Sequence, residues 1–548
     1  GNIGSGEVFL KLKYLRVLQL PLVTSQELPT SISKLIHLRF LDLSLSRFKA
    51  LPESICKLYN LQTLVLSTYL NPATFKELPD GMRNLINLRH LLFFTPDSKF
   101  RMPKGMGQLT CLKTLQFFNI GKEEGCKIEE VGCLKNLRGQ ILIRNLEFVN
   151  AKREAEQADL LSKSNLNDLV FEWGSGREGE YNDEDVLEGL LPHPNLQSLY
   201  VKNYMGSQFP RWLMNMSIAK YNMYGSLRRL DRLVKLVLVD CKMCEDAPAL
   251  GRLPSLEFLA LDGLDKLTCL GRSFYDMDDR RASRNNSSSE VSNTLFPALK
   301  SLVLSEMPNL REWMDAQAES RRESNEDVKV FPILEDLTIN KCYRLVNAPS
   351  NFPSLKSLKI QKIDKLQPVK KICSNATNLS AVWIKGMADL THVQDVLNGL
   401  NLQALILEKC PELVDIHGGL HQLQNLDSLV IGGCHNLETI PIPSGQKGLT
   451  SLKDLRIGYC NGLTSLPVEM LEARSSLLSL TVCKCPNLVS FPIDLRQMPS
   501  LVSLALFGCP KLTTIPKGLD QVSSLSMLHV GPFLDSHTEN EWLSALAS

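Results

Sequence analysis

The sequence predicts an α/β repeat fold, a solenoid with a parallel β-sheet on the concave face and short helical or irregular segments on the convex face. The first observation is a pattern, L-x-x-L-x-L-x-x-C-x-x-L-x-x-I-P, that returns through the C-terminal part of the chain. The second is its period, because the first leucines of successive copies are 24, 26, 25 and 24 residues apart at Leu402, Leu426, Leu452, Leu477 and Leu501. Only stacked copies of one unit can share a continuous apolar interior. Together these observations indicate a leucine-rich-repeat solenoid, or horseshoe.

Each copy begins with a short strand whose alternate leucines face inward while the intervening residues face outward. Parallel stacking of such strands about 5 Å apart builds the sheet. The slot that follows closes the turn, and a small side chain with little polar demand fits there. The slot holds Cys241, Cys342, Cys410, Cys434, Cys460, Cys485 and Cys509, replaced elsewhere by Val23, Leu264, Met307, Ile363 and Met387. Because apolar residues substitute for them, we predict that the slot cysteines are buried, reduced and structural.

Composition narrows the class of protein further. The net charge is only +2, which does not favour nucleic acid as a partner. No apolar run approaches the roughly 18 residues of a membrane span, and no secretory signal opens the chain. An odd count of 15 cysteines, with seven in the buried slot, suits a reducing compartment. We therefore expect a cytoplasmic protein, with the nucleus or the inner face of the plasma membrane as further locations.

Along the chain, the first-leucine series predicts about 20 copies between Leu15 and Leu525. A repeat with no cap before it exposes core, so the chain is expected to follow an upstream domain. The pattern leaves the path of residues 213–232 undetermined. The predicted regions are a linker remnant at 1–14, N-terminal repeats at 15–136, irregular repeats at 137–232 with an acidic loop at 174–185, C-terminal repeats at 233–533 with mobile polar loops at about 273–294 and 315–329, and a tail at 534–548.

One helix-like piece lies in the irregular region. In residues 151–163 the side chains of Ala155, Ala158 and Leu161 fall on one face at helical spacing.

The residue after the first leucine of each early copy is usually basic. Equivalent positions of adjacent copies stack, so these residues are expected to form a positive rim that faces an acidic surface of a neighbouring domain or is solvated. The rim consists of Arg16, Arg39, Arg89, Lys113 and Arg138, with Gln62 at the remaining position.

The irregular region contains several distinctive strings, at Leu137–Ile143, Glu154–Leu160 (E-A-x-x-A-x-L), Leu166–Trp173 (L-x-x-L-x-x-x-W), Val186–Leu196 (VLE-x-L-x-P-H-x-NL) and Phe209–Trp212 (FP-x-W). They resemble strings of plant intracellular nucleotide-binding leucine-rich-repeat (NLR) disease-resistance proteins of the coiled-coil class. The resemblance covers most of the chain. It implies an immune-receptor repeat region that binds a pathogen effector or a guarded host protein and contacts a nucleotide-binding domain intramolecularly.

The resemblance also implies ADP or ATP, but only in that upstream domain. No G-x-x-x-x-G-K-[ST] phosphate loop occurs in this sequence, so we expect no cofactor in this chain and no ATP binding or hydrolysis.

Three local motifs point weakly to other chemistry. Gly174, Gly176 and Gly179 spell G-x-G-x-x-G, but acidic residues that would repel a pyrophosphate follow directly. Cys241 and Cys244 form a single C-x-x-C without a second pair, so no metal site is expected. His417 and His421 are separated by two glycines and are expected on the convex surface. No catalytic motif is present, and we predict no enzyme.

The outward positions of the strands are the candidates for partner binding, because they can vary without disturbing the core. In the early and middle copies these positions hold Phe94, Phe118, Tyr200 and Lys202. The main candidates are in the late copies: Lys359, Gln361, Trp383, Lys385, Glu408, Asp454, Arg456, Phe507 and His529.

Two further functions compete with the immune-receptor interpretation. A substrate receptor of a ubiquitin ligase would carry an F-box-like segment before the repeats. A cell-surface ectodomain would show paired cysteine caps and an L-x-G-x-I-P repeat, which this sequence lacks.

Overall fold

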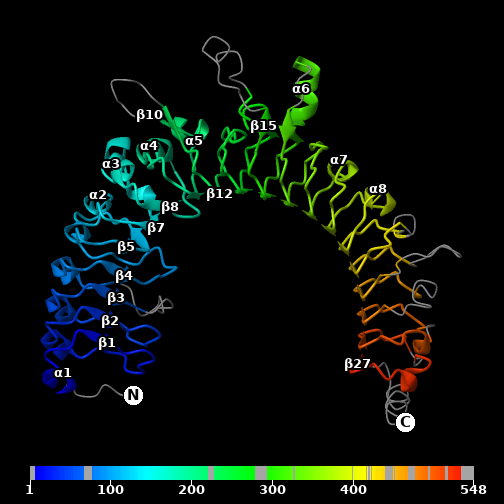
Figure 1. Cartoon of the computed structure of the whole chain (residues 1–548), viewed down its shortest axis with the longest axis horizontal. Helices are drawn as coiled ribbons and strands as arrows, with labels where there is room; N and C mark the ends of the chain where they lie inside the picture. Colours follow the sequence, from blue (N-terminus) through cyan, green and yellow to red (C-terminus); the bar gives the residue numbers. More distant parts are fainter. Residues whose placement is uncertain are drawn as a thin grey trace. The chain divides into compact units, whose positions relative to one another are not determined.

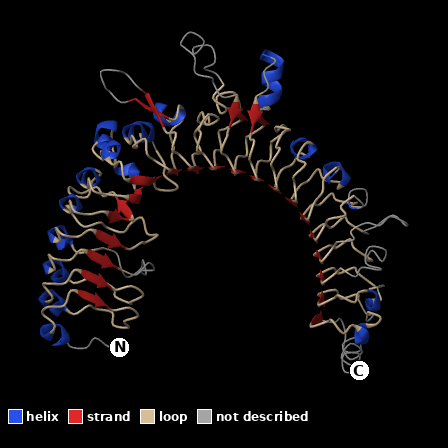
Figure 2. Ribbon diagram, in the orientation of Figure 1, coloured by secondary structure: helices blue, strands red, loops and turns tan. Residues whose placement is uncertain are grey.

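The computed structural model describes residues 7–66, 77–179, 181–219, 227–277, 293–324, 328–397, 399–414, 416, 420, 422–438, 449, 451–466, 476–491, 494–512 and 516–531. The chain divides into two compact units, Gly1–Lys266 and Leu267–Ser548. Within each unit the strands follow one face, and most of the short helices lie on the opposite face (Figure 1, Figure 2). The predicted leucine-rich-repeat fold with a parallel sheet is confirmed.

The first unit contains two parallel sheets. The first has the order β1 (Val17–Gln19), β2 (Phe40–Asp42), β3 (Thr63–Val65), β4 (His90–Leu92) and β5 (Thr114–Leu115). The second runs through β6 (Phe117–Asn119), β7 (Gly139–Arg144), β8 (Leu166–Glu172), β9 (Ser198–Lys202), β12 (Lys235–Val239) and β13 (Phe258–Asp262).

Single helical turns connect these strands on the other face. The α-helices are α1 (Glu7–Lys11), α2 (Glu129–Cys133), α3 (Lys152–Glu156), α4 (Asp183–Gly189) and α5 (Arg211–Met214). The 3₁₀ turns are η1 (Thr30–Lys34), η2 (Glu53–Lys57), η3 (Asp80–Asn84), η4 (Met106–Gln108), η5 (Leu146–Phe148) and η6 (Leu160–Ser162). Proline precedes η1, η2 and η3, where its fixed φ suits the first turn and its missing N–H is not needed.

The second unit contains one long parallel sheet of consecutive repeats. Its strands are β16 (Ser301–Ser305), β19 (Asp336–Asn340), β20 (Ser357–Gln361), β21 (Ala381–Lys385), β22 (Ala404–Glu408), β23 (Ser428–Gly432), β24 (Asp454–Gly458), β25 (Ser479–Cys483), β26 (Ser503–Phe507) and β27 (Met527–Gly531). The turns opposite the sheet include α6 (Ala316–Ser324), α7 (Gln367–Ser374), α8 (Gln394–Leu397), η9 (Leu495–Gln497) and η10 (Leu519–Gln521). Two short parallel pairs, β14 (Cys269–Leu270) with β17 (Glu312–Trp313) and β15 (Thr294–Leu295) with β18 (Lys329–Val330), lie outside the long sheet.

The core is a stack of equivalent side chains, as the repeat pattern predicts. Leu405, Leu429 and Leu455 are opposite one another in adjacent strands, and all are fully buried. All seven slot cysteines are buried, and no cysteine forms a disulfide. The apolar substitutes in the slot are buried as well. The predicted burial of the slot cysteines is confirmed.

The residue before the slot adopts a left-handed conformation, which the pattern alone does not predict. Lys362 and Lys409 have φ values of 53° and 52°, and the glycines at the same position, Gly386 and Gly433, have 64° and 67°. A left-handed lysine costs roughly 1 to 2 kcal/mol. A hydrogen bond offsets part of this cost, because the Lys362 N–H donates to the Lys385 carbonyl at 2.7 Å.

The outward assignment of Phe118 was wrong. A bend at Gln116 separates β5 from β6, and it shifts the alternation of faces by one residue. Phe118 is therefore paired with Ile143 and fully buried, whereas Phe94 is 37% exposed.

Two other local predictions need correction. The helix expected over 151–163 ends at Glu156, and Asp159 is left-handed with a φ of 45°, so Leu160 is buried in place of Leu161. The segment 315–329 was expected to lack order, yet residues Ala316–Ser324 form α6. Its sequence, AQAESRRES, is rich in residues with good helix propensity.

The first polar loop and the region of undetermined path are partly described. Phe274 and Tyr275, at the start of the loop predicted at 273–294, are buried, while residues 278–292 lie outside the described residues. In the 213–232 region, β10 (Ser217–Ala219) pairs antiparallel with β11 (Leu227–Arg229). His417, His421 and the tail at 534–548 lie outside the described residues.

Candidate functional site

The predicted partner-binding residues occupy rows that run across the strands of the second unit. The in-register pairs place Lys359 beside Trp383, and Trp383 beside Ile406. A second row, closer to the strand ends, joins Gln361 to Lys385 and Lys385 to Glu408. Lys359, Gln361, Trp383, Lys385, Glu408 and Ile406 therefore form one continuous surface, which we call the Trp383 patch.

Trp383 lies between two lysine ammonium groups. The Nζ atoms of Lys359 and Lys385 are 5.5 and 5.7 Å from the ring centroid, within the range of cation–π attraction. Lys385 also forms an ion pair with Glu408, with 2.8 Å between Nζ and Oε2. The indole Nε1 is buried and has no hydrogen-bond partner among the residues that the structure describes. An aromatic anchor with adjacent cations is a composition typical of binding hot spots.

The other candidates lie farther along the same sheet, in two separate groups. Asp454 and Arg456 pair with each other on β24, at 2.9 Å from Nε to Oδ2. Phe507 stacks on His529 across β26 and β27, with ring centroids 4.7 Å apart. Strand β23 separates the Trp383 patch from Asp454 and Arg456. The structure thus brings five of the nine predicted residues together and leaves four at a distance.

The basic rim has the stacked geometry that the sequence predicts. In the series Arg16, Arg39, Gln62, Arg89, Lys113 and Arg138, each residue after Arg16 donates its N–H to the carbonyl of the residue before it in the series, at 2.7 to 2.9 Å. In the described part of the chain, no salt bridge joins any of its five cations to a carboxylate.

The positive charge of this rim affects the pKa of the neighbouring His90. Burial lowers the pKa of His90, and the charges of Arg138, Lys113 and Arg89 lower it further. Its Nδ1 lies 3.0 Å from the Thr114 hydroxyl. The rim is therefore a positively charged surface, and no carboxylate among the described residues neutralises it through a salt bridge.

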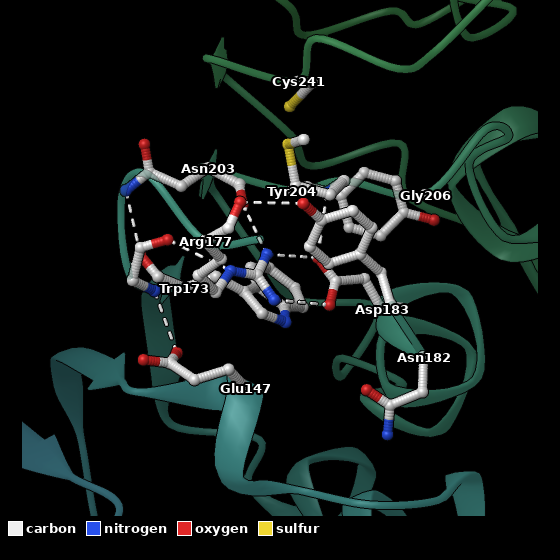
Figure 3. Close-up of polar contacts among 12 residues, drawn as sticks. Glu147, Trp173, Arg177, Asn182, Asp183, Asn203, Tyr204, Gly206 and Cys241 are labelled. Atoms are coloured by element: carbon white, nitrogen blue, oxygen red, sulfur yellow. Dashed lines mark hydrogen bonds and ion pairs between the residues drawn. The ribbon is translucent and has the colours of Figure 1, made fainter. Parts of the chain in front are cut away.

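Among the described residues, the most buried ion pair lies in the acidic loop at 174–185, for which the sequence predicts no site (Figure 3). Arg177 meets Asp183 through two parallel hydrogen bonds, at 3.0 Å from Nη1 to Oδ1 and 2.6 Å from Nη2 to Oδ2. The Asp183 side chain is 0% exposed and that of Arg177 is 15% exposed. Paired planar groups of this kind are strong and directional.

Neighbouring backbone groups complete this cluster. Arg177 donates from Nε to the Gly174 carbonyl at 3.1 Å and from Nη2 to the Asn203 carbonyl at 2.9 Å. Asp183 also accepts the Met205 N–H at 2.8 Å. The Asn203 amide donates to the Trp173 carbonyl at 2.9 Å (Figure 3). The Arg177–Asp183 cluster thus fastens the loop after β8 to the loop after β9.

The motifs that suggested nucleotide or metal chemistry have other partners. The N–H of Gly174, the first glycine of the G-x-G-x-x-G string, donates to the Glu147 carboxylate at 2.8 Å. The Cys244 thiol donates to the Gly206 carbonyl at 3.3 Å, and Cys241 is fully buried. Among the described residues, no group of three or more metal-ligating side chains comes together. Within those residues, no helix is long and apolar enough to cross a bilayer.

Two family models match parts of the chain. The model described as R13L1/DRL21 LRRs matches residues 128–264, which include the Arg177–Asp183 cluster. The model described as Plant disease resistance protein RPS2-like, leucine-rich repeats, matches residues 314–461, which include the Trp383 patch.

Curated relatives extend this comparison. The putative disease resistance RPP13-like protein 1 of Arabidopsis thaliana is 32% identical over 340 residues, covering 59% of this chain and 30% of the relative. The putative disease resistance protein RGA1 of Solanum bulbocastanum is 32% identical over 339 residues, covering 62% of this chain and 28% of the relative. Disease resistance protein RGA2 of the same species is 33% identical over 292 residues, covering 52% of this chain and 26% of the relative.

Solved structures show weaker likeness. The TLR13–ssRNA13 complex covers 96% of this chain and 87% of that chain, with 15% identity and a TM-score of 0.44. The match to the PEPR1–AtPEP1 structure covers 100% of this chain and 90% of that chain, with 15% identity and a TM-score of 0.30. These scores carry no argument about function.

The strand ladder and the buried slot define a leucine-rich-repeat protein. The matched models and relatives then specify it further: over residues 128–264 and 314–461 the chain is similar to the leucine-rich repeats of plant disease-resistance proteins. It spans 30% and 28% of the length of the first two relatives.

Proposed function

We propose that this chain is the protein-recognition and autoinhibitory repeat region of a plant immune receptor. In this role it senses a pathogen effector, directly or through a guarded host protein, and controls a nucleotide switch in an upstream domain. The observation that carries the recognition role is the Trp383 patch, where an aromatic side chain and two cations stand on an open strand face. The names of the relatives, which describe disease resistance, support the same role.

The autoinhibitory role is supported by the basic rim. An intramolecular partner of a cationic ladder is an acidic surface, because complementary charge fixes register and orientation. We propose that this acidic surface belongs to the nucleotide-binding domain, that ADP or ATP binds there, and that the receptor acts in the cytoplasm. A substrate receptor of a ubiquitin ligase remains the alternative function, but none of the relatives described above supports it.

The test of recognition uses the full-length receptor, expressed in leaf tissue with a panel of pathogen effectors. A responding effector is then tested against the double variant Trp383→Ala with Lys385→Glu. We expect the response to be lost while the unfolding free energy of the purified chain changes by no more than about 1 kcal/mol, since outward positions contribute little to the core.

The matched control is Tyr343→Ala with Lys365→Glu, which also truncates an aromatic side chain and reverses a lysine charge, but away from the strand face. Tyr343 is exposed in the turn after the slot, and Lys365 pairs with Asp389 on the surface at 3.4 Å. This control should respond like the unmodified receptor. A retained response in the Trp383 variant would place the recognition site elsewhere, and a large loss of stability would show that Trp383 is structural.

A further inference from the structure

The charges of the Trp383 patch do not balance among the described residues. Lys385 is neutralised by Glu408, with 2.8 Å between the charged atoms. Lys359 is exposed, and it has no carboxylate partner in the part of the chain that the structure describes. Two lysines and one glutamate therefore leave one positive charge beside the ring.

The edge of the sheet next to the patch adds to this excess. Lys362 and Lys409 are exposed left-handed residues that follow β20 and β22. Neither has an ion pair among the described side chains. Between them Gly386 is left-handed, and a Cβ placed there would lie 3.5 Å from the Lys362 Cγ. The Lys362 side chain therefore extends over the glycine, toward the repeat that holds Lys409.

The two lysines that flank Trp383 differ in their partners. Lys385 pairs with Glu408, whereas the contact of the Lys359 ammonium among the described residues is the Trp383 ring. A carboxylate that approached from outside would pair with the Lys359 ammonium without breaking an ion pair among the described residues, which is not true of Lys385.

The indole N–H of Trp383 is the second unsatisfied feature. It is a donor only, and it is buried without an acceptor in this structure. A buried donor without an acceptor carries a desolvation penalty that a new acceptor removes. A partner that displaced the atoms covering Nε1 and supplied a backbone carbonyl would relieve this penalty.

The apolar part of the patch is Ile406, the residue beside Trp383 in the next strand. Val430 continues the row on β23. Both are half-buried, so they offer apolar surface to a partner without being part of the interior.

We propose that the Trp383 patch binds an exposed protein segment in which a carboxylate side chain adjoins an apolar one. The carboxylate pairs with Lys359, the apolar side chain covers Trp383 and Ile406, and a backbone carbonyl accepts the Trp383 indole N–H. This inference rests on the proposed recognition function and adds the chemistry of the partner.

The experiment selects a phage library of random 12-residue peptides on the purified chain, with counter-selection on the Trp383→Ala variant. The expected consensus contains aspartate or glutamate next to a large apolar residue. A basic or uncharged consensus overturns the proposal, and so does a selection whose binding survives Trp383→Ala.

A synthetic peptide of the consensus is then titrated into chain labelled with ¹⁵N-tryptophan, whose five indole signals include one assigned by Trp383→Phe. The Trp383 indole N–H signal should shift on binding. Lys359→Glu should weaken the acidic peptide about tenfold and strengthen its lysine-for-carboxylate counterpart, whereas Lys365→Glu should change neither. Equal affinity of the two peptides for the unmodified chain, or an unmoved Trp383 signal at saturation, overturns the proposal.

Failure of this inference is distinct from failure of the proposed function. If the leaf response depends on Trp383 but the selected peptides are not acidic, the site is correct and the partner chemistry is wrong. If the leaf response survives the Trp383 double variant, the recognition site itself is wrong.

Discussion

At the scale of single residues, the left-handed position before the slot shows how one repeat constrains the next. Glycine at this position follows a repeat with a long side chain there: Lys409 precedes Gly433, and Lys484 precedes Gly508. A Cβ added at Gly433 or Gly508 would lie 3.2 or 3.0 Å from the Cγ of that lysine. Glycine therefore avoids both the strain of a left-handed φ and a close contact with the covering side chain, whereas Lys362 and Lys484 adopt the same conformation at the equivalent position.

The slot itself leads to a prediction about stability. Cys434 and Leu429 are both fully buried, but truncation of leucine removes more atoms and leaves a larger cavity. We expect Cys434→Ala to lower the unfolding free energy by about 1 kcal/mol and Leu429→Ala to lower it by roughly 2 to 5 kcal/mol, measured by denaturant titration. Rapid labelling of Cys434, Cys460 or Cys509 by a thiol reagent in the folded chain would contradict the assignment of these residues to the core.

A second prediction concerns alkaline pH. Burial raises the pKa of Cys460 from 9 to about 11. Between these values the unfolded thiol loses its proton while the folded thiol keeps it, so stability falls as pH rises, by about 1.4 kcal/mol per pH unit for this group. Denaturant titrations at pH 8.5 and 10.5 should show a smaller loss in Cys460→Ala than in the unmodified chain. An equal loss in both would sink this account of the thiol.

Residue patterns predict much of the candidate surface. Alternation along the strands correctly places Lys359, Trp383 and Lys385 on the outward face, because the side-chain period of a strand is two. The same rule fails at Phe118, where a bend in the chain shifts the alternation. Rotamers also lie beyond the pattern, so the ion pair of Lys385 with Glu408 and the orphan indole N–H of Trp383 emerge only from the structure.

At the scale of elements, regular repeats were easier to predict than the connections between them. The strands follow from leucine spacing, whereas α3 ends early because Asp159 is left-handed. The acidic loop is the clearest case. Its high density of charge suggested a solvated connection, but Asp183 and Arg177 turn inward and satisfy each other. The signal that could have revealed them is an arginine six residues before an aspartate that begins a helix with Val186 and Leu187 on its buried side.

The Arg177–Asp183 cluster leads to a prediction about this element. Asp183→Asn should lower the unfolding free energy by about 3 to 5 kcal/mol, because the Arg177 guanidinium would stay largely buried without its counter-charge. Asp185→Asn is the matched control, since Asp185 is exposed in the same first turn of α4, and it should change stability by less than about 0.5 kcal/mol. Equal effects of the two substitutions, measured by denaturant titration, would show that the pair contributes nothing specific.

At the scale of the whole molecule, the hydrogen bonds between strands stack equivalent residues of successive repeats, so the charges of their side chains add up along the sheet. The six rim positions are joined by successive hydrogen bonds, so their side chains present charge at a repeat-to-repeat spacing of about 5 Å. The sequence predicts this ladder well because its register follows from the first leucines. It does not identify the acidic partner, because that partner is outside the chain.

The rim leads to a prediction for the complete receptor. Reversing Arg39 and Arg89 to Glu should weaken the resting state and produce a leaf response without any effector, because the rim would then repel an acidic neighbour. Glu substitution of Lys365 and Lys511, which lie outside the Trp383 patch, is a control with the same change of charge on the second unit. Unchanged resting behaviour of the rim variant counts against an autoinhibitory contact at this surface.

The central claim is that recognition and restraint use different surfaces of one repeat region. The most direct measurement is the effector-free leaf response of a receptor that combines Arg39→Glu and Arg89→Glu with Trp383→Ala and Lys385→Glu. If the Trp383 patch only recognises a partner, the combined variant responds as strongly as the rim variant alone, because recognition precedes release. A silent combined variant, expressed at the same level as the rim variant, would contradict the claim, since the patch would then be needed for signalling itself.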